Sequence, residues 1–223
     1  KYMPKHKVLI IAAHPDDEVL GCGATIARLV KEGDSAFCLL LNKGRSKQTS
    51  QNNKANLLAQ KEAVQASRVL GVSKVFFLDL PDQKYDTVPL LDIVQKIEKI
   101  KQEIKPDIVF THHPSDLNLD HKITSRAVLT VFRPLKGEKA KKIYGFDVQE
   151  ASKWLENGFV PNTFFDVSAV FNKKILALKA YKSELKKYPH PRSIEAIETT
   201  AKYWGVVSGQ GKSEAFVLLR HLV

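Results

Sequence analysis

The chain has 223 residues, 43% of them hydrophobic and 26% charged, a composition typical of a globular protein with room for one full core. Its apolar runs are far shorter than the about 18 residues of a membrane-spanning helix, so we expect no stable membrane insertion. The net charge of +11 suits nucleic acid, but the lysines are dispersed and their denser pairs lack interleaved aromatic residues for base stacking, so we expect no nucleic acid partner.

Short branched apolar runs alternate with helical segments over the first 131 residues. The basic segment 1–7 leads into a first strand at 8–12 and shows no secretory cleavage pattern. Further strands are expected at 36–41, 75–78 and 107–111, helices at 19–31, 54–70 and 90–104, a polar loop at 43–53, and a helix from the loop 112–120 to residue 131. This alternation predicts an α/β fold, a Rossmann-like, mostly parallel sheet with helices on both faces.

The last third of the chain is less regular. Strands are expected at 164–167 and 215–219, helices at 173–185 and 194–203, and a flexible stretch at 205–211. We expect one domain over 1–223, with a Rossmann-like core to about residue 135 and C-terminal elements from about 136 to 223 that complete the cleft. Cys22 and Cys38 lie in apolar segments, which predicts buried free thiols and a reducing, cytoplasmic location.

Two polar clusters follow predicted strands. The first is His14-Pro15-Asp16-Asp17-Glu18, after the first strand, and the second runs from Thr111 to His121, after the fourth. Ligands of open parallel sheets bind beyond the carboxyl ends of the strands, so both clusters should lie at one edge of the sheet. The segment Gly21-Cys22-Gly23-Ala24 lacks the G-x-G-x-x-G spacing, and we expect no dinucleotide there.

The residue types in these clusters suit a metal ion. His14 and Asp17 are three residues apart, so a turn at a helix start can aim both at one point, and His121 can supply a third ligand. Asp16 would then be free to act on water. The alternative is that the acidic residues only cap the helix and offset its dipole, with the histidines as ordinary loop residues.

The first motif, together with Asp120-His121 after a later strand, resembles the LmbE-like or PIG-L family of metal-dependent N-deacetylases. The resemblance runs over most of the chain and includes Gly44, Leu80-Pro81-Asp82 and Pro106-Asp107. It implies that His14, Asp17 and His121 bind Zn²⁺, with Fe²⁺ or Co²⁺ as the alternative metal. It also implies that Asp16 is the general base and that Asp120 supports the ligands.

One position departs from the family pattern. Members often carry a histidine two residues before the acid that precedes the last ligand, and here that residue is Asn118. Asparagine can donate a hydrogen bond to an oxyanion but cannot act as a general acid near neutral pH. Asp16 is therefore expected to serve as base and acid, with His113 as a second candidate for the acid.

The segment from Tyr188 to Ser193 holds two prolines and is stiff. It could place His190 and Arg192 in a substrate cleft, where Arg192 could grip a phosphate bidentately; the alternative is a rigid surface turn.

The resemblance implies removal of the acetyl group from an N-acetylated amino sugar or its conjugate. Positive charge favours an anionic small-molecule conjugate, phosphate- or nucleotide-linked. A nucleotide- or nucleic-acid-binding module and a catalytically silent metal-binding relative are the two alternatives. The sequence leaves the oligomeric state open, and a homo-oligomer is one alternative because members of the family often form oligomers.

Overall fold

The computed structural model describes residues 6–44, 53–149, 158–182 and 184–223. Within them one sheet has the strand order β3-β2-β1-β4-β5-β7-β6. Its strands are β1 (Lys7–Ala12), β2 (Ser35–Leu40), β3 (Lys74–Phe77), β4 (Ile108–His112), β5 (Lys142–Phe146), β6 (Thr163–Asp166) and β7 (Ser213–His221). The five strands from β3 to β5 are parallel, and β7 pairs antiparallel with both of its neighbours, β5 and β6. The prediction of a mostly parallel α/β sheet is confirmed.

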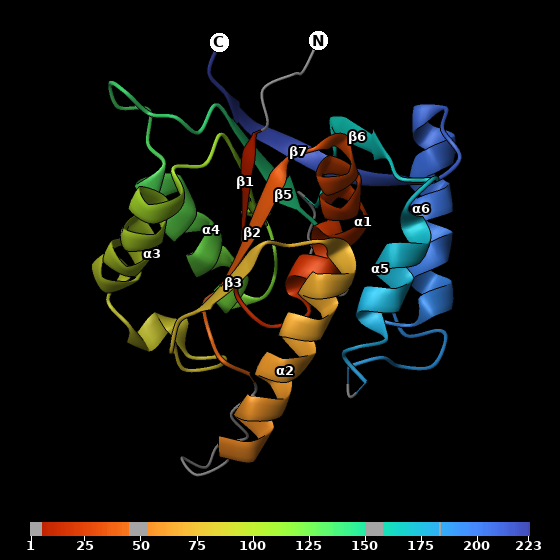
Figure 1. Cartoon of the computed structure of the whole chain (residues 1–223), viewed down its shortest axis with the longest axis horizontal. Helices are drawn as coiled ribbons and strands as arrows, with labels where there is room; N and C mark the ends of the chain where they lie inside the picture. The colour runs from red at the N-terminus through yellow and green to blue at the C-terminus, as the bar shows by residue number, and fades with distance from the viewer. Residues whose placement is uncertain (1–5, 45–52, 150–157, 183) are drawn as a thin grey trace.

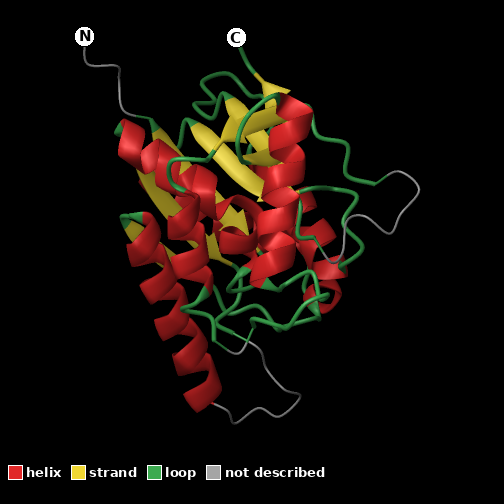
Figure 2. Cartoon of the chain, turned by 90° about the vertical axis from the view of Figure 1, so that its right-hand side faces the viewer, coloured by secondary structure: helices red, strands yellow, loops and turns green. Residues whose placement is uncertain are grey.

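Helices cover both faces of the sheet (Figures 1 and 2). They are α1 (Asp17–Glu32), α2 (Asn53–Leu70), the short 3₁₀ helix η1 (Tyr85–Thr87), α3 (Leu90–Ile104), α4 (Leu119–Val131), α5 (Phe171–Leu178) and α6 (Ile194–Ser208). Alternate residues of β1 face opposite ways, so Val8 and Ile10 pack in the core with α1, α2, α5 and α6, whereas Leu9 and Ile11 pack with α3 and α4. The buried strand β1 is thus held from both sides.

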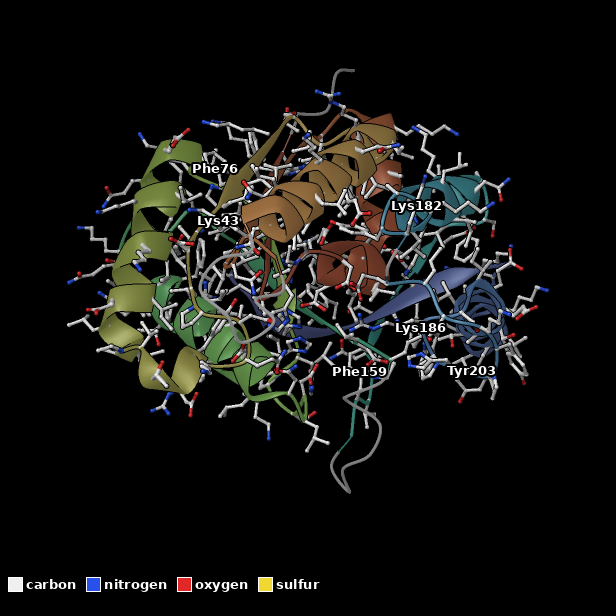
Figure 3. All side chains as sticks on the ribbon, turned by 90° about the horizontal axis from the view of Figure 1, so that it is seen from below. Lys43, Phe76, Phe159, Lys182, Lys186 and Tyr203 are labelled. Atoms are coloured by element: carbon white, nitrogen blue, oxygen red, sulfur yellow. The ribbon has the colours of Figure 1, made fainter. Side chains whose placement is uncertain are left out.

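The order of the strands reverses between β1 and β4, which makes this the switch point of the sheet. The chain adds β2 and β3 on one side of β1 and then crosses to β4 and β5 on the other. In such a sheet the crossover helices diverge at the switch point, beyond the carboxyl ends of the two central strands. Both polar clusters begin there, and Figure 3 looks at the molecule from that end.

Three elements differ from the sequence expectations. Strand β5 was not predicted, because its five residues begin with the second lysine of the pair Lys141-Lys142 and include Gly145. Helix α5 ends at Leu178 and not at residue 185, since the chain turns there and buries Tyr181 against the first polar cluster. Helix α6 continues to Ser208 through Gly205, where a Cβ would lie 2.5 Å from the carbonyl oxygen of Gly211.

Other expectations are met or lie outside the structure. Cys22 and Cys38 are free and buried, as predicted. Of the predicted loop 43–53, residues 45–52 lie outside the described residues, as does residue 183 of the predicted helix 173–185. In the part of the chain that is described, the helices are too short or too polar to cross a membrane.

Candidate active site

Three side chains from the two clusters converge at the carboxyl ends of β1 and β4. Nδ1 of His14 lies 3.1 Å from Oδ2 of Asp17 and 3.2 Å from Nε2 of His121. The third side of this triangle, from Nε2 of His121 to Oδ2 of Asp17, is 3.2 Å. All three side chains are buried. The structure therefore brings together the three residues proposed as ligands, and we call them the ligand triad.

The ligand triad has the dimensions of a zinc site. Metal–ligand bonds of about 2.0–2.1 Å in a tetrahedron put neighbouring donor atoms about 3.3 Å apart, close to the distances found here. Oδ1 of Asp17 is also buried and has no hydrogen-bond partner in the described structure. A buried carboxylate with one oxygen unpartnered is costly, and a cation at the triangle would offset its charge. Two imidazoles and one carboxylate suit zinc or a neighbouring first-row metal and leave one position open.

Each histidine of the triad is held by a carboxylate on its other ring nitrogen. Nε2 of His14 lies 3.0 Å from Oδ2 of Asp120, and Nδ1 of His121 lies 2.9 Å from Oδ2 of Asp116. Such carboxylate partners fix the ring orientation and the tautomer that presents a lone pair to a metal. Asp116 is fully buried and was not singled out in the sequence; its only signal was an acid within the cluster, five residues before His121.

Both carboxylate oxygens of Asp120 accept hydrogen bonds from the protein. Besides His14, its carboxylate accepts the backbone amides of Gln83 (2.8 Å) and Tyr85 (3.0 Å). Asp82 lies near the same ring nitrogen of His14, at 3.4 Å. Because the hydrogen bonds of Asp120 are already made with protein donors, we read Asp82, Asp120 and Nε2 of His14 as support for the triad and not as a second metal site.

His112 packs against the ligand triad at the end of β4. Its Nε2 accepts the backbone amide of Ala13 (2.9 Å), which ties the end of β4 to the end of β1, and its ring stacks on His121 with centroids 3.9 Å apart. Burial and the neighbouring His121 hold the pKa of His112 well below its usual value. A neutral imidazole that accepts a backbone hydrogen bond is a packing element here, and His121 is the proposed ligand of the two stacked rings.

Asp16 stands beside the triad but points elsewhere. It is buried, and its Oδ2 accepts a hydrogen bond of 2.7 Å from Nη1 of Arg192, which also reaches Oε2 of Glu184 at 3.2 Å. Burial raises the pKa of Asp16 well above that of an exposed aspartate, although Arg192 opposes the shift. A carboxyl group whose pKa lies closer to neutrality is better suited to take up and return a proton.

The imidazoles of the triad are poised for a cation. Burial alone would lower the pKa of His14, but Asp120 and Asp17 raise it to about 9. Burial acts in the same direction on His121, but Asp17 and Asp116 raise its pKa to about 10. A pocket that stabilises two imidazolium ions also stabilises a divalent metal, which would displace their protons.

Asn118 begins helix α4. Its Oδ1 accepts the backbone amide of Asp120 (2.9 Å) and its Nδ2 donates to Oε1 of Gln83 (3.5 Å). Nε2 of Gln83 in turn lies 3.4 Å from Nε2 of His14. One donor contact of the Asn118 side chain therefore goes to Gln83, beside a ligand of the triad, whereas its oxygen caps the helix.

The three residues expected at the substrate lie in different settings. Arg192 reaches Asp16, as described above, and its own backbone amide donates to Nδ1 of His190 at 3.1 Å, which shapes their shared loop. His113 is engaged with Oγ of Ser115 (2.7 Å) and with the ring of Phe159. Arg192 thus belongs to the surroundings of the proposed base, a link that the sequence did not reveal.

The Gly-Cys-Gly segment of α1 is a break in the helix. Cys22 has non-helical angles (φ −144°, ψ 19°). The carboxylate of Glu214 accepts the amide of Thr25 (2.6 Å), while Nζ of Lys174 donates to the carbonyl of Leu20 (2.7 Å) and to Glu214 (2.6 Å). This buried ion pair joins the two halves of α1 and so supports the first turn, which carries Asp17.

Known proteins resemble this chain over most of its length. The GlcNAc-PI de-N-acetylase (PIG-L) family model matches residues 9–132, which include both polar clusters. The uncharacterized deacetylase YaiS of Escherichia coli K12 is 30% identical over 79% of this chain and 90% of its own length. The diacetylchitobiose deacetylase of Thermococcus kodakarensis is 28% identical over 93% of this chain and 81% of its own. Among solved structures, the conserved protein TT1542 of Thermus thermophilus has a TM-score of 0.78 at 28% identity and covers 98% of this chain and 96% of its own.

Proposed function

Because this chain belongs to the PIG-L family of GlcNAc-PI de-N-acetylases, we propose that it hydrolyses the N-acetyl amide of an amino sugar or of its conjugate. The observation that carries the proposal is the buried triangle of His14, Asp17 and His121 with Asp16 beside it. The proposed metal is zinc, with Fe²⁺ or Co²⁺ as the alternative, because all three accept a site of two imidazoles and one carboxylate.

The residues of the chain have the following proposed roles. His14, Asp17 and His121 hold the metal, which when bound would polarise water and the amide carbonyl. Asp16 takes a proton from the attacking water and returns it to the nitrogen of the leaving amine, so that acetate and a free amine are released. Burial raises the pKa of Asp16, which supports its proposed role as both base and acid.

Two further side chains are assigned supporting roles in catalysis. The side-chain NH₂ of Asn118 donates a hydrogen bond to the oxygen of the tetrahedral intermediate. Relatives often carry a histidine at this position. Asp120 keeps His14 in the tautomer that presents Nδ1 to the metal. Since asparagine supplies no proton, the proton balance of the reaction rests on Asp16, and His113 stays the second candidate for the acid.

We propose an anionic substrate, phosphate- or nucleotide-linked. Seen from the end of the molecule that carries the site, Lys43 lies on one side of α1, and Lys182 and Lys186 lie on the other (Figure 3). These cations would raise the local concentration of an anion. Residues 136–223 would complete the cleft, with His190, Arg192 and His113 as proposed substrate contacts.

The setting of the protein is part of the same proposal. The two free thiols favour a reducing cytoplasm. A homo-oligomer is proposed because members of the family often form oligomers.

An acetate-release assay tests the proposal. Purified protein would be incubated with N-acetylhexosamines that are free, phosphorylated, nucleotide-linked, thiol-linked or lipid-linked, with and without a chelator. We expect release from an anionic conjugate that stops when the metal is removed and returns with zinc.

The alternatives give different results. A nucleotide- or nucleic-acid-binding module would purify without stoichiometric metal, and a silent relative would hold metal but release no acetate from any of these substrates. Equal rates with and without chelator would exclude a metal-dependent reaction.

A further inference from the structure

The backbone of Asp16 has an unusual conformation. Its φ is 106° and its ψ −31°, in a region that residues with a side chain rarely occupy. Such strain persists only where the surrounding structure enforces it, and it gathers at functional sites. The residue with this backbone is the one proposed to carry the proton.

Glu18 is in contact with this strained peptide. Its Oε2 accepts a hydrogen bond of 3.0 Å from the backbone amide of Asp16. Its Oε1 accepts a hydrogen bond of 2.5 Å from the hydroxyl of Tyr181, which follows α5 and lies 163 residues further along the chain. Glu18 and Tyr181 are both buried, at 1% and 2% exposure. The two contacts join the C-terminal third of the protein to the backbone of Asp16.

Ordinary capping accounts for only half of this arrangement. At a helix start the side chain of the residue before the helix usually accepts an amide of the first turn, and a glutamate later in that turn reaches back. Asp16 occupies the capping position of α1, but its side chain makes no such hydrogen bond and is turned to Arg192. Glu18 therefore secures the backbone at the helix start while the carboxylate of Asp16 stays available for other chemistry.

We propose that Glu18 and Tyr181 are positioning residues that hold Asp16 in its strained backbone conformation and thereby aim its carboxylate. The inference rests on the proposed function of Asp16 as the proton carrier. Without the oxygen of Glu18, the amide of Asp16 would lose its partner and the backbone would relax to negative φ. A change of φ rotates the side chain about the backbone, so the carboxylate would move away from Arg192 and from the reacting atoms. The ligand triad would keep its own contacts.

Four single variants test this role. Glu18→Ala removes the oxygen that accepts the amide of Asp16, and displacement of the base by about 1 Å can lower kcat by about 10²-fold. Tyr181→Phe removes one hydrogen bond from Glu18 and should lower kcat by about tenfold. Glu18→Gln keeps an oxygen for Asp16 and offers an NH₂ to the hydroxyl of Tyr181, so it should stay within about threefold of wild type. Tyr144→Phe, in the aromatic core beside Phe110, is the matched control and should leave kcat unchanged.

Two readouts separate positioning from a general loss of stability. Metal content, measured by elemental analysis, should remain at the wild-type value in all four variants, and KM should change little. In an Asp16→Asn background, Glu18→Ala should cause no further loss of rate, because residues that act as one unit are not additive. A further loss of about 10²-fold in that background, or loss of metal together with rate, would overturn the proposal.

A crystal structure of Glu18→Ala makes the test independent of the substrate. We expect Asp16 at negative φ with its contact to Arg192 broken, even if the wild-type protein releases no acetate and the proposed function fails. An unchanged positive φ at Asp16, with the contact to Arg192 retained, would overturn the positioning role whatever the activity.

Discussion

Asp116 holds the second imidazole of the ligand triad, and Asp116→Asn is the most informative single change. Its Oδ2 lies 2.9 Å from Nδ1 of His121, and its Oδ1 accepts the backbone amide of Asn118 at 2.9 Å. The carboxylate is fully buried, so water cannot replace either contact. Asparagine has the same shape but a single acceptor oxygen for these two donors.

Either orientation of the new amide carries a cost. If its oxygen faces Asn118, its NH₂ faces His121 and favours the tautomer with the proton on Nε2, the atom that belongs to the triad. If its oxygen faces His121, its NH₂ faces the backbone N–H of Asn118, so two donors meet and that N–H loses its acceptor. A buried unsatisfied group costs about 1–3 kcal/mol. Loss of such a ligand partner lowers metal affinity by about 10–100-fold, or about 1.4–2.8 kcal/mol.

Competition for zinc against a chromophoric chelator measures this affinity directly. Asp107→Asn is the matched control, because Asp107 also accepts a backbone amide, that of Lys7 at 2.8 Å, but at the opposite end of β1 and β4. We expect a weaker zinc affinity for Asp116→Asn and the wild-type affinity for Asp107→Asn. Wild-type affinity in Asp116→Asn, with the fold intact by circular dichroism, would refute the assignment of His121 as a ligand oriented by Asp116.

The proposed base, the ligand imidazoles and the buried ion pair of α1 each give one more expected result. Asp16→Asn should keep its metal but lose about 10²–10⁴-fold in acetate release, and a loss below about tenfold would remove Asp16 from the role of base. Zinc added to metal-free protein at about pH 7.5 should displace about two protons, because the pKa values of His14 (about 9) and His121 (about 10) keep both rings charged until the metal binds. Calorimetry in buffers of different ionisation enthalpy counts these protons, and a count of zero would contradict the ligand set. Glu214→Ala leaves Lys174 charged and buried, so urea denaturation should show a loss of about 3–5 kcal/mol in the free energy of unfolding. A loss below about 1 kcal/mol would show that the break in α1 does not depend on the pair.

Local patterns in the sequence determined the frame of the protein. Apolar runs such as residues 8–12, separated by helical segments, predicted the parallel sheet, because hydrophobic periodicity reports directly on the local backbone. The ends of β1 and β4 then placed His14 and His121 at one edge of the sheet, since parallel strands share the direction of their carboxyl ends. The spacing of His14 and Asp17 within one turn supplied the remaining proposed ligand.

Only the tertiary structure decided what surrounds these residues. Strand β5 gave no periodic signal, and the partnership of Asp116 with His121 depends on the path of a loop. Tyr181 and Arg192 reach Glu18 and Asp16 across 163 and 176 residues of chain. Contacts over such separations depend on how the C-terminal third packs against the sheet, and no local pattern of side chains encodes that packing. The sequence therefore identified the residues of the proposed chemistry, whereas the fold decided how they are held.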